Sequence, residues 1–228
     1  MLAHSPRIIT DGLVLCLDAA NRKSYPTTGT TWTDLSGLGN TGTLVNGVGY
    51  NGSNGGSLSF DGVNDYVSTA PFDDTTTNRT FSVWYNPLNT VNTYPLNRGR
   101  DGAGSAWSCL LGSENVSGGK YRTAVVQNNT LYITYSTSLV TLNRWVCLTG
   151  VWTNGGSISL YVNGIFESSV LVPSAPLRTS AEGWIVGCLD TSAFPNQQVA
   201  QVSIYNRALS ASEIKQNYNA LKSRYGLT

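Results

Sequence analysis

Apolar and polar residues alternate along much of this chain, and this pattern predicts β-strands. The alternation is clear in residues 57–60, 81–85 and 157–162, and a period of two is typical of a strand with one buried and one exposed face. Residues 13–19 and 144–152 are apolar at both parities, as expected for strands covered on both faces. The whole pattern predicts about eleven to thirteen strands, which must stack as two sheets.

One helix is predicted, over about residues 210–224. Ser210 and Glu213 have the spacing of a capping box, and Leu209 and Ile214 stand at the two hydrophobic-staple positions. An apolar stripe at helical spacing follows, formed by Ile214, Tyr218, Leu221 and Tyr225. We therefore expect this helix to cover the sandwich rather than to hold a cofactor.

No Pro-rich or charge-rich linker divides the chain, so residues 11–228 are predicted to form a single domain. Residues 1–10 show no periodicity and are interpreted as an N-terminal arm. The arm carries the apolar residues Leu2, Pro6, Ile8 and Ile9. They are more apolar than a solvated tail requires, so we expect them to dock on a partner. The alternative is that Ile8 and Ile9 pack on their own sandwich as a short edge strand.

Composition narrows the function. Among 228 residues, 14 are basic and 13 are acidic, so no electrostatic pattern favours nucleic acid or an anionic membrane as a partner. No apolar run is long enough for a transmembrane segment, and the first ten residues lack the apolar centre of a signal peptide. Four cysteines, Cys16, Cys109, Cys147 and Cys188, lie inside apolar runs. This placement predicts buried thiols rather than a zinc or redox site.

The residues that catalysis would need are missing from the sequence. Retaining β-glucan hydrolases place two carboxylates about 5 Å apart on one strand face, but none of the four glutamates has that spacing. The single histidine, His4, lies in the arm, which excludes a histidine-dependent nucleophile within one chain. We therefore expect no enzymatic activity and no catalytic residues. A glycoside hydrolase remains an option only if an unrecognised carboxylate pair exists.

Four strings stand in a fixed order along the chain: TWTDLSGLGNTGTL (31–44), FDGVNDYV (60–67), LYVNG (160–164) and IYNRALSASEI (204–214). Together they resemble the laminin G-like, concanavalin A-like jelly-roll family over residues 11–225. This resemblance implies an all-β fold, an antiparallel two-sheet jelly-roll sandwich with one C-terminal helix.

Members of that family often bind a calcium ion through an aspartate in an Ile-Asp-x-Val string. The corresponding string here is Val199-Ala200-Gln201-Val202, which lacks the acid. Asp18 and Asp61 remain as oxygen donors, fewer than calcium prefers. We therefore expect no metal and no cofactor, and leave only a structural calcium ion open.

Two segments near the chain ends resemble a version of this domain found in structural proteins of tailed phages. They are LDAANRKSY (17–25) and the segment from Ile204 to Leu227. That resemblance implies a non-enzymatic virion surface protein, such as a capsid decoration, a head fibre or a tail appendage. Its partners would be other virion proteins, its location the virion, and homo-oligomerisation stays open.

The alternative function is a glycan-binding adhesin. Sugar binding needs exposed aromatic rings beside hydrogen-bonding groups. The candidate residues are Tyr85, Trp107, Tyr132, Tyr135 and Tyr161. Clustering of exposed rings on the concave sheet would favour the adhesin, whereas their burial in the core would favour the virion role.

Overall fold

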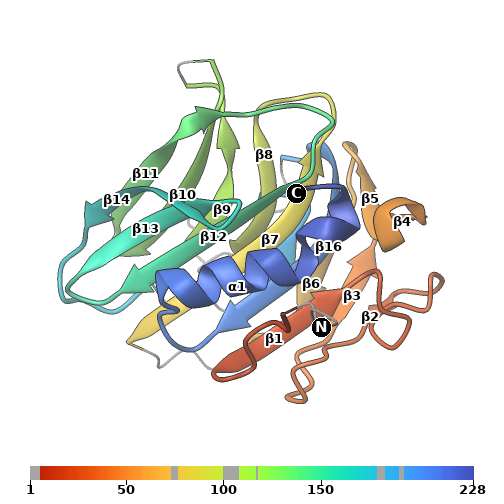
Figure 1. The fold of residues 1–228 in the computed structure, drawn as a ribbon, viewed down its shortest axis with the longest axis horizontal. Coiled ribbons are helices and arrows are strands. Elements are labelled where there is room, and N and C mark those ends of the chain that lie inside the picture. Colours follow the sequence, from red (N-terminus) through yellow and green to blue (C-terminus); the bar gives the residue numbers. More distant parts are fainter. Residues whose placement is uncertain (1–5, 73–76, 100–107, 117, 179–182, 190–192) are drawn as a thin grey trace.

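The computed structural model describes residues 6–72, 77–99, 108–116, 118–178, 183–189 and 193–228. Within these ranges sixteen strands form two eight-stranded antiparallel sheets, and one α-helix lies near the C-terminus (Figure 1). The predicted fold, an all-β two-sheet sandwich with one C-terminal helix, is confirmed.

The first sheet has β7 and β16 at its centre. Its order is β14-β13-β12-β7-β16-β5-β4, and β1 pairs with the C-terminal half of β16 where β5 pairs with the N-terminal half. The strands are β14 (Ile165–Leu171), β13 (Ser157–Val162), β12 (Val146–Thr153), β7 (Asn78–Pro87), β16 (Asn196–Tyr205), β5 (Ser57–Asp61), β4 (Gly49–Asn51) and β1 (Leu13–Asp18).

The second sheet has the order β11-β10-β9-β8-β15-β6-β3-β2. Its strands are β11 (Thr130–Leu139), β10 (Lys120–Gln127), β9 (Cys109–Glu114), β8 (Thr93–Arg98), β15 (Trp184–Val186), β6 (Tyr66–Thr69), β3 (Gly42–Val45) and β2 (Thr31–Trp32). Two 3-10 turns complete the described elements, η1 (Ser53–Gly55) and η2 (Lys222–Tyr225).

The main core lies between the sheets and extends along the chain from Leu15 to Ile204. As the alternation predicts, Phe81, Val83 and Tyr85 of β7 point into this core. Trp32 is also fully buried there, which fixes the long loop that precedes it. The four cysteines are buried thiols without a disulfide, as expected from their apolar surroundings.

Helix α1 (Ala211–Leu221) crosses the outer face of the first sheet (Figure 1). Ser210 and Glu213 form the predicted capping box, and Arg207 pairs with Glu213 at 2.6 Å. Ile214, Tyr218 and Tyr225 are buried, as expected from the stripe. Leu221 is only half-buried, so it contributes less to packing than the pattern predicts.

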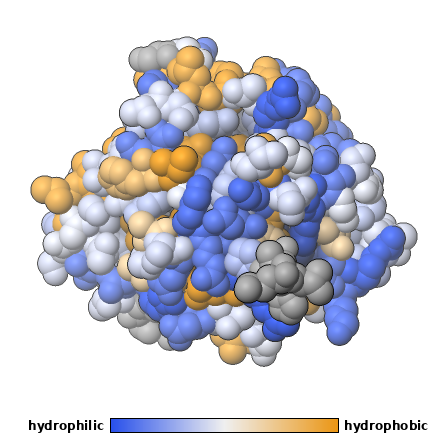
Figure 2. Space-filling model, viewed as in Figure 1, coloured by the Kyte–Doolittle hydropathy of each residue, from blue (hydrophilic) through white to orange (hydrophobic). Residues whose placement is uncertain are grey.

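Figure 2 shows the same side of the molecule, with hydrophilic residues over α1 and hydrophobic ones at the left, near β13 and β14. Exposed apolar side chains of β14 include Ile165, Phe166 and Leu171. At this end the edge strands of the two sheets, β14 and β11, lie close together. Glu167 of β14 accepts a hydrogen bond from the backbone N–H of Thr137 in β11 at 3.0 Å. Burial acts to raise the pKa of Glu167, but hydrogen bonds from Ser138 and Thr137 outweigh it and lower that pKa.

Candidate functional site

A cluster of two tyrosines, an arginine and a glutamate lies on the outer face of the second sheet. Tyr94, Glu114, Arg122 and Tyr135 come from the four neighbouring strands β8, β9, β10 and β11. Arg122 stands opposite Tyr135 in the sheet register. Its neighbours Tyr121 and Thr123 are inward by alternation, and Tyr121 belongs to the main core, so Arg122 faces outward. We call these four residues the tyrosine–arginine cluster.

A β-bulge in β8 positions Tyr94. The register between β8 and β9 shifts between Thr93 and Leu96, where Pro95 has no N–H to donate to a ladder. Gly112 of β9 makes room for this bulge, because a side chain there would overlap the carbonyl oxygen of Thr93. The bulge places the Tyr94 ring beside Arg122, whose Cζ lies 5.6 Å from the ring centroid.

The cluster is joined by charge-assisted hydrogen bonds. Arg122 Nη1 donates to Glu114 Oε2 at 2.7 Å, and the Tyr135 hydroxyl donates to the same oxygen at 2.9 Å. Burial raises the pKa of Tyr135, and hydrogen bonding to Glu114 raises it further. Tyr135 therefore remains a neutral hydrogen-bond donor at physiological pH.

The two charged partners differ in exposure. The Arg122 side chain is 10% exposed, whereas the Glu114 side chain is 38% exposed. Within the described part of the chain, Glu114 Oε1 forms no hydrogen bond, and the buried Arg122 Nε also has no partner. The cluster thus presents an unused carboxylate oxygen beside two half-buried tyrosine rings.

This arrangement suits binding rather than hydrolysis. Aromatic rings beside a few convergent polar groups are the usual features of a sugar site. A retaining glycosidase also needs a second carboxylate about 5–5.5 Å from the first, and the cluster contains only Glu114.

The five aromatic residues predicted from the sequence do not form one surface. Tyr135 belongs to the cluster, and Trp107 lies outside the described residues. The prediction is wrong for Tyr85, which is fully buried between the sheets and accepts a hydrogen bond from Thr93 at 3.2 Å. Its position on the apolar face of β7 explains this burial. Tyr132 packs against the main core, and Tyr161 lies on the first sheet beside Phe166.

The N-terminal arm is attached to its own domain where it is described. The backbone N–H of Ile9 donates to Asn217 of α1 at 2.7 Å, and its carbonyl accepts from Tyr205 at 2.9 Å. Ile9 also packs against the buried group that includes Tyr205 and Ile214, and Ile8 is half-buried. Neither residue lies in an edge strand, and docking of the arm on a partner stays a prediction. Pro6 is exposed, while Leu2 lies outside the described residues.

The acidic residues considered for calcium have other roles. Asp18 accepts two hydrogen bonds from Arg224, at 2.8 and 3.0 Å, and Asp61 accepts one from the N–H of Val63 at 2.8 Å, as turn aspartates do. Among the described residues no three or more His, Cys, Asp or Glu side chains group together as metal ligands would. The absence of a cofactor stays a prediction.

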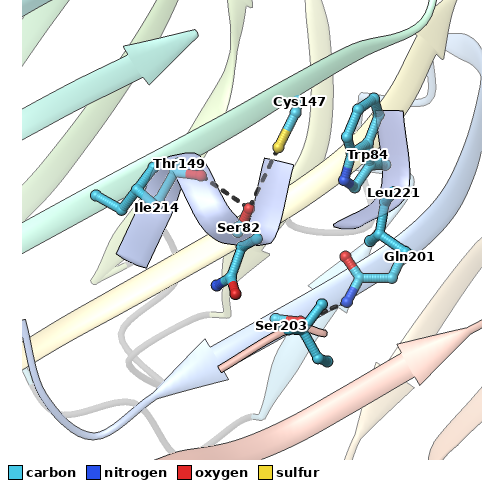
Figure 3. Close-up of a pocket in the computed structure, with 10 residues that line it drawn as sticks. Ser82, Trp84, Cys147, Thr149, Gln201, Ser203, Ile214 and Leu221 are labelled. Carbon is cyan, nitrogen blue, oxygen red and sulfur yellow. Dashed lines mark hydrogen bonds between the residues drawn. The ribbon is translucent and has the colours of Figure 1, made fainter. Parts of the chain in front are cut away.

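Two cavities lie away from the tyrosine–arginine cluster, and neither has the features of a sugar site. The space beneath α1 holds only about 10 Å³ and is lined by Ser82, Cys147, Thr149 and Gln201, among others (Figure 3). The side chains there bond one another, since Ser82 Oγ lies 2.9 Å from Thr149 Oγ1. An open groove of about 560 Å³ runs beside residues 6–13 and the end of α1. None of its described lining residues is aromatic, so it offers no ring for stacking.

Sequence reasoning missed Tyr94, Glu114 and Arg122. Arg122 had a usable signal, because it is a charged residue at the outward parity of an apolar strand. The positions of Tyr94 and Glu114 depend on the bulge and on strand order, which the sequence does not reveal.

Among the described residues no helix is long and apolar enough to cross a membrane.

Comparison with solved structures identifies similar folds among toxin binding domains. The binding domain of Paraclostridial Mosquitocidal Protein 1 superposes with a TM-score of 0.70 at 16% identity, over 92% of this chain and 52% of that one. The botulinum neurotoxin serotype D ligand binding domain in complex with N-acetylneuraminic acid gives 0.71 at 17% identity, over 92% and 51%. The receptor binding domain of botulinum neurotoxin type G gives 0.65 at 17% identity, over 91% and 51%. The chain therefore spans about half the length of these structures.

No curated protein matches the sequence. A family model, in contrast, matches residues 60–215, well over half of the chain, and covers the strands that carry the tyrosine–arginine cluster. With the two antiparallel sheets and the ordered motifs, this match shows that the chain belongs to the laminin G-like family of the concanavalin A-like lectin/glucanases superfamily.

Proposed function

We propose that this protein is a non-enzymatic glycan-binding domain and that its ligand binds at the tyrosine–arginine cluster. One observation carries the proposal: the sheet brings Tyr94 and Tyr135 beside an arginine and a half-open carboxylate on its outer face.

Each group has a role that its chemistry permits. A tyrosine ring offers an apolar face for the C–H face of a sugar at low conformational cost. The unused Glu114 Oε1 accepts a hydrogen bond from a sugar hydroxyl. Arg122 holds the carboxylate in place through its bond to Oε2. Because these groups sit on paired strands, little ordering is needed when the ligand binds.

The comparisons support this proposal at the level of the fold. The matched structures are named as binding domains, one of them with a bound sugar. Since this chain matches half of each, the position of that sugar is not carried over. The site assignment rests on the cluster alone.

A glycan array followed by calorimetry on the full chain tests the proposal. We expect the wild-type protein to bind at least one neutral oligosaccharide and Tyr94→Ala to weaken that binding about tenfold or more, since loss of one stacking ring costs on the order of 1–2 kcal/mol. Tyr135→Phe keeps the ring and removes the bond to Glu114, so a smaller loss is expected.

Tyr161→Ala is the matched control, because Tyr161 is also a half-buried tyrosine but lies on the other sheet. It should bind as the wild type does. Loss of binding in Tyr161→Ala with retention in Tyr94→Ala would move the site to the first sheet.

Display on a virus particle is the second proposal, and it rests on the resemblance of the chain ends. In the structure these ends pack together, as the Asp18–Arg224 ion pair at 2.8 Å shows. Glycan binding and display on a particle are compatible. Imaging of purified particles with an antibody to this chain tests the location, and its absence from particles would exclude it.

A further inference from the structure

We infer that the tyrosine–arginine cluster selects uncharged glycans over anionic ones. This inference rests on the proposed glycan-binding function and adds the class of sugar. It follows from the difference in solvent exposure between Glu114 and Arg122, which form an ion pair.

The more exposed charge of the tyrosine–arginine cluster is negative. Glu114 is 38% exposed and keeps Oε1 unbonded, whereas Arg122 is 10% exposed and uses Nη1 on Glu114. The Arg122 Nε is buried, so a ligand does not reach it in this conformation. A sugar beside the tyrosine rings therefore meets a carboxylate that is more exposed than the guanidinium.

An ionised carboxylate only accepts hydrogen bonds, so its natural partners are hydroxyl or amide donors. A uronate, sialate or sulfate group at the same place brings only acceptors and a like charge. Arg122 offsets this repulsion only in part, because its side chain is 10% exposed and its Nη1 already donates to Glu114. The site thereby excludes anionic sugars by repulsion as well as selecting neutral ones by fit.

Lys120 is the other charged residue to consider, because it faces Glu114 in the register of β9 and β10. Its Nζ donates to the carbonyl oxygen of Thr137 at 3.3 Å. It forms no ion pair with Glu114. Lys120 is therefore held by the neighbouring strand β11, and we expect it to leave the preference for neutral sugars intact.

The experiment compares neutral oligosaccharides with their sialylated, uronate-containing and sulfated counterparts on the full chain. We expect each neutral member to bind about tenfold or more tightly than its anionic counterpart in low salt. Raising the salt concentration should narrow that ratio by improving anionic binding, since screening weakens repulsion. Equal or tighter binding of the anionic members would overturn the inference.

Two variants sharpen the result. Glu114→Gln keeps the side-chain shape and removes the charge, so the ratio should fall to about threefold or less. Lys120→Met should leave the ratio unchanged, and a ratio that rises in Lys120→Met would show that Lys120 attracts anions. If Glu114→Gln does not fold, the salt dependence of the wild-type protein still decides the question.

The two proposals fail in different ways. If no probe binds, or if binding survives Tyr94→Ala, the glycan site itself is wrong. If binding depends on Tyr94 but anionic sugars bind equally well, only the selectivity is wrong.

Discussion

The two outer faces of the sandwich each carry an arginine–carboxylate pair, and the pairs are arranged in opposite ways. Near α1, the Asp18 side chain is 12% exposed and its partner Arg224 is 28% exposed. In the tyrosine–arginine cluster the carboxylate is the open member and the arginine is the buried one. The first pair fastens the C-terminal segment to the sheet, whereas the second leaves an acceptor facing solvent. Exposure of the carboxylate is the feature that sets the second of these two pairs apart from the first.

The aromatic residues of the two outer faces also differ, because those on the first sheet pack on one another. On the first sheet, Trp84 stacks on Tyr225 with ring centroids 4.4 Å apart and on Tyr218 at 5.5 Å. Among the described residues, Tyr94 and Tyr135 have no such aromatic partner. The rings stacked on Trp84 stabilise the fold, whereas Tyr94 and Tyr135 are half-buried and keep part of their surface open to a ligand. Counting aromatic residues in the sequence does not separate these two cases.

The largest effect is expected for Tyr225→Ala, which removes a buried ring that packs on Trp84 and Trp145. The free energy of unfolding should fall by about 3 kcal/mol, the low end for a buried aromatic residue because the segment is near the chain end. Urea unfolding measures this loss.

Ser223→Ala is the control for Tyr225→Ala, since Ser223 is exposed in the same turn and should have little effect. Sugar binding by folded Tyr225→Ala should equal that of the wild type. A change in affinity would show that the two faces are coupled, and the comparison between them would no longer hold.

Much of the fold could be predicted from the sequence because it depends on local pattern. The alternation in β7 and β13 and the capping box at Ser210 each encode their own structure. Strands β3, β4, β8 and β14 were not predicted. The first two lie in a stretch rich in Gly, Thr and Asn, and β8 contains Pro95 at its bulge. Polar or interrupted segments become strands here because neighbouring strands supply their hydrogen bonds.

The site was harder to predict because its residues meet only across four strands. The motifs that carry the family resemblance do not lie in it. Asp34 of the TWTDLSG string accepts a hydrogen bond from the N–H of Cys16 at 2.8 Å, and Arg207 of the IYNRALS string pairs with Glu213. These residues hold the fold together. The resemblance therefore predicts the fold well and says little about what the outer face binds.

A smaller effect is expected for Leu221→Ala. The helical stripe alone suggests a fully buried leucine and a loss of about 2–4 kcal/mol. In the structure Leu221 is half-buried and packs against the group that contains Trp84 and Tyr225. A loss of about 1–2 kcal/mol is expected, because a half-buried leucine has less buried apolar surface to lose. Urea unfolding of Leu221→Ala and Tyr225→Ala side by side tests whether Leu221→Ala costs less stability. A larger loss for Leu221→Ala would show that Leu221 packs more tightly on the sheet than its half-buried position indicates.

The smallest effect is a change in how stability responds to acid. Glu213 has a pKa lowered to about 2, first because Arg207 donates a side-chain hydrogen bond to it and second because the Ser210 backbone does. A carboxyl group with a lower pKa in the folded state stabilises the fold above its ordinary pKa near 4.5, and this contribution is lost as the pH falls towards 2. Since the Glu213 side chain is 28% exposed, solvent reduces the size of the effect. Melting temperatures of wild type and Glu213→Gln between about pH 6 and pH 2 should therefore converge with acid. Parallel curves would mean that the Arg207–Glu213 pair does not stabilise the start of α1, and that α1 is held on the first sheet by its other contacts, such as the packing of Ile214 and Tyr218 and the bond from Ile9 to Asn217.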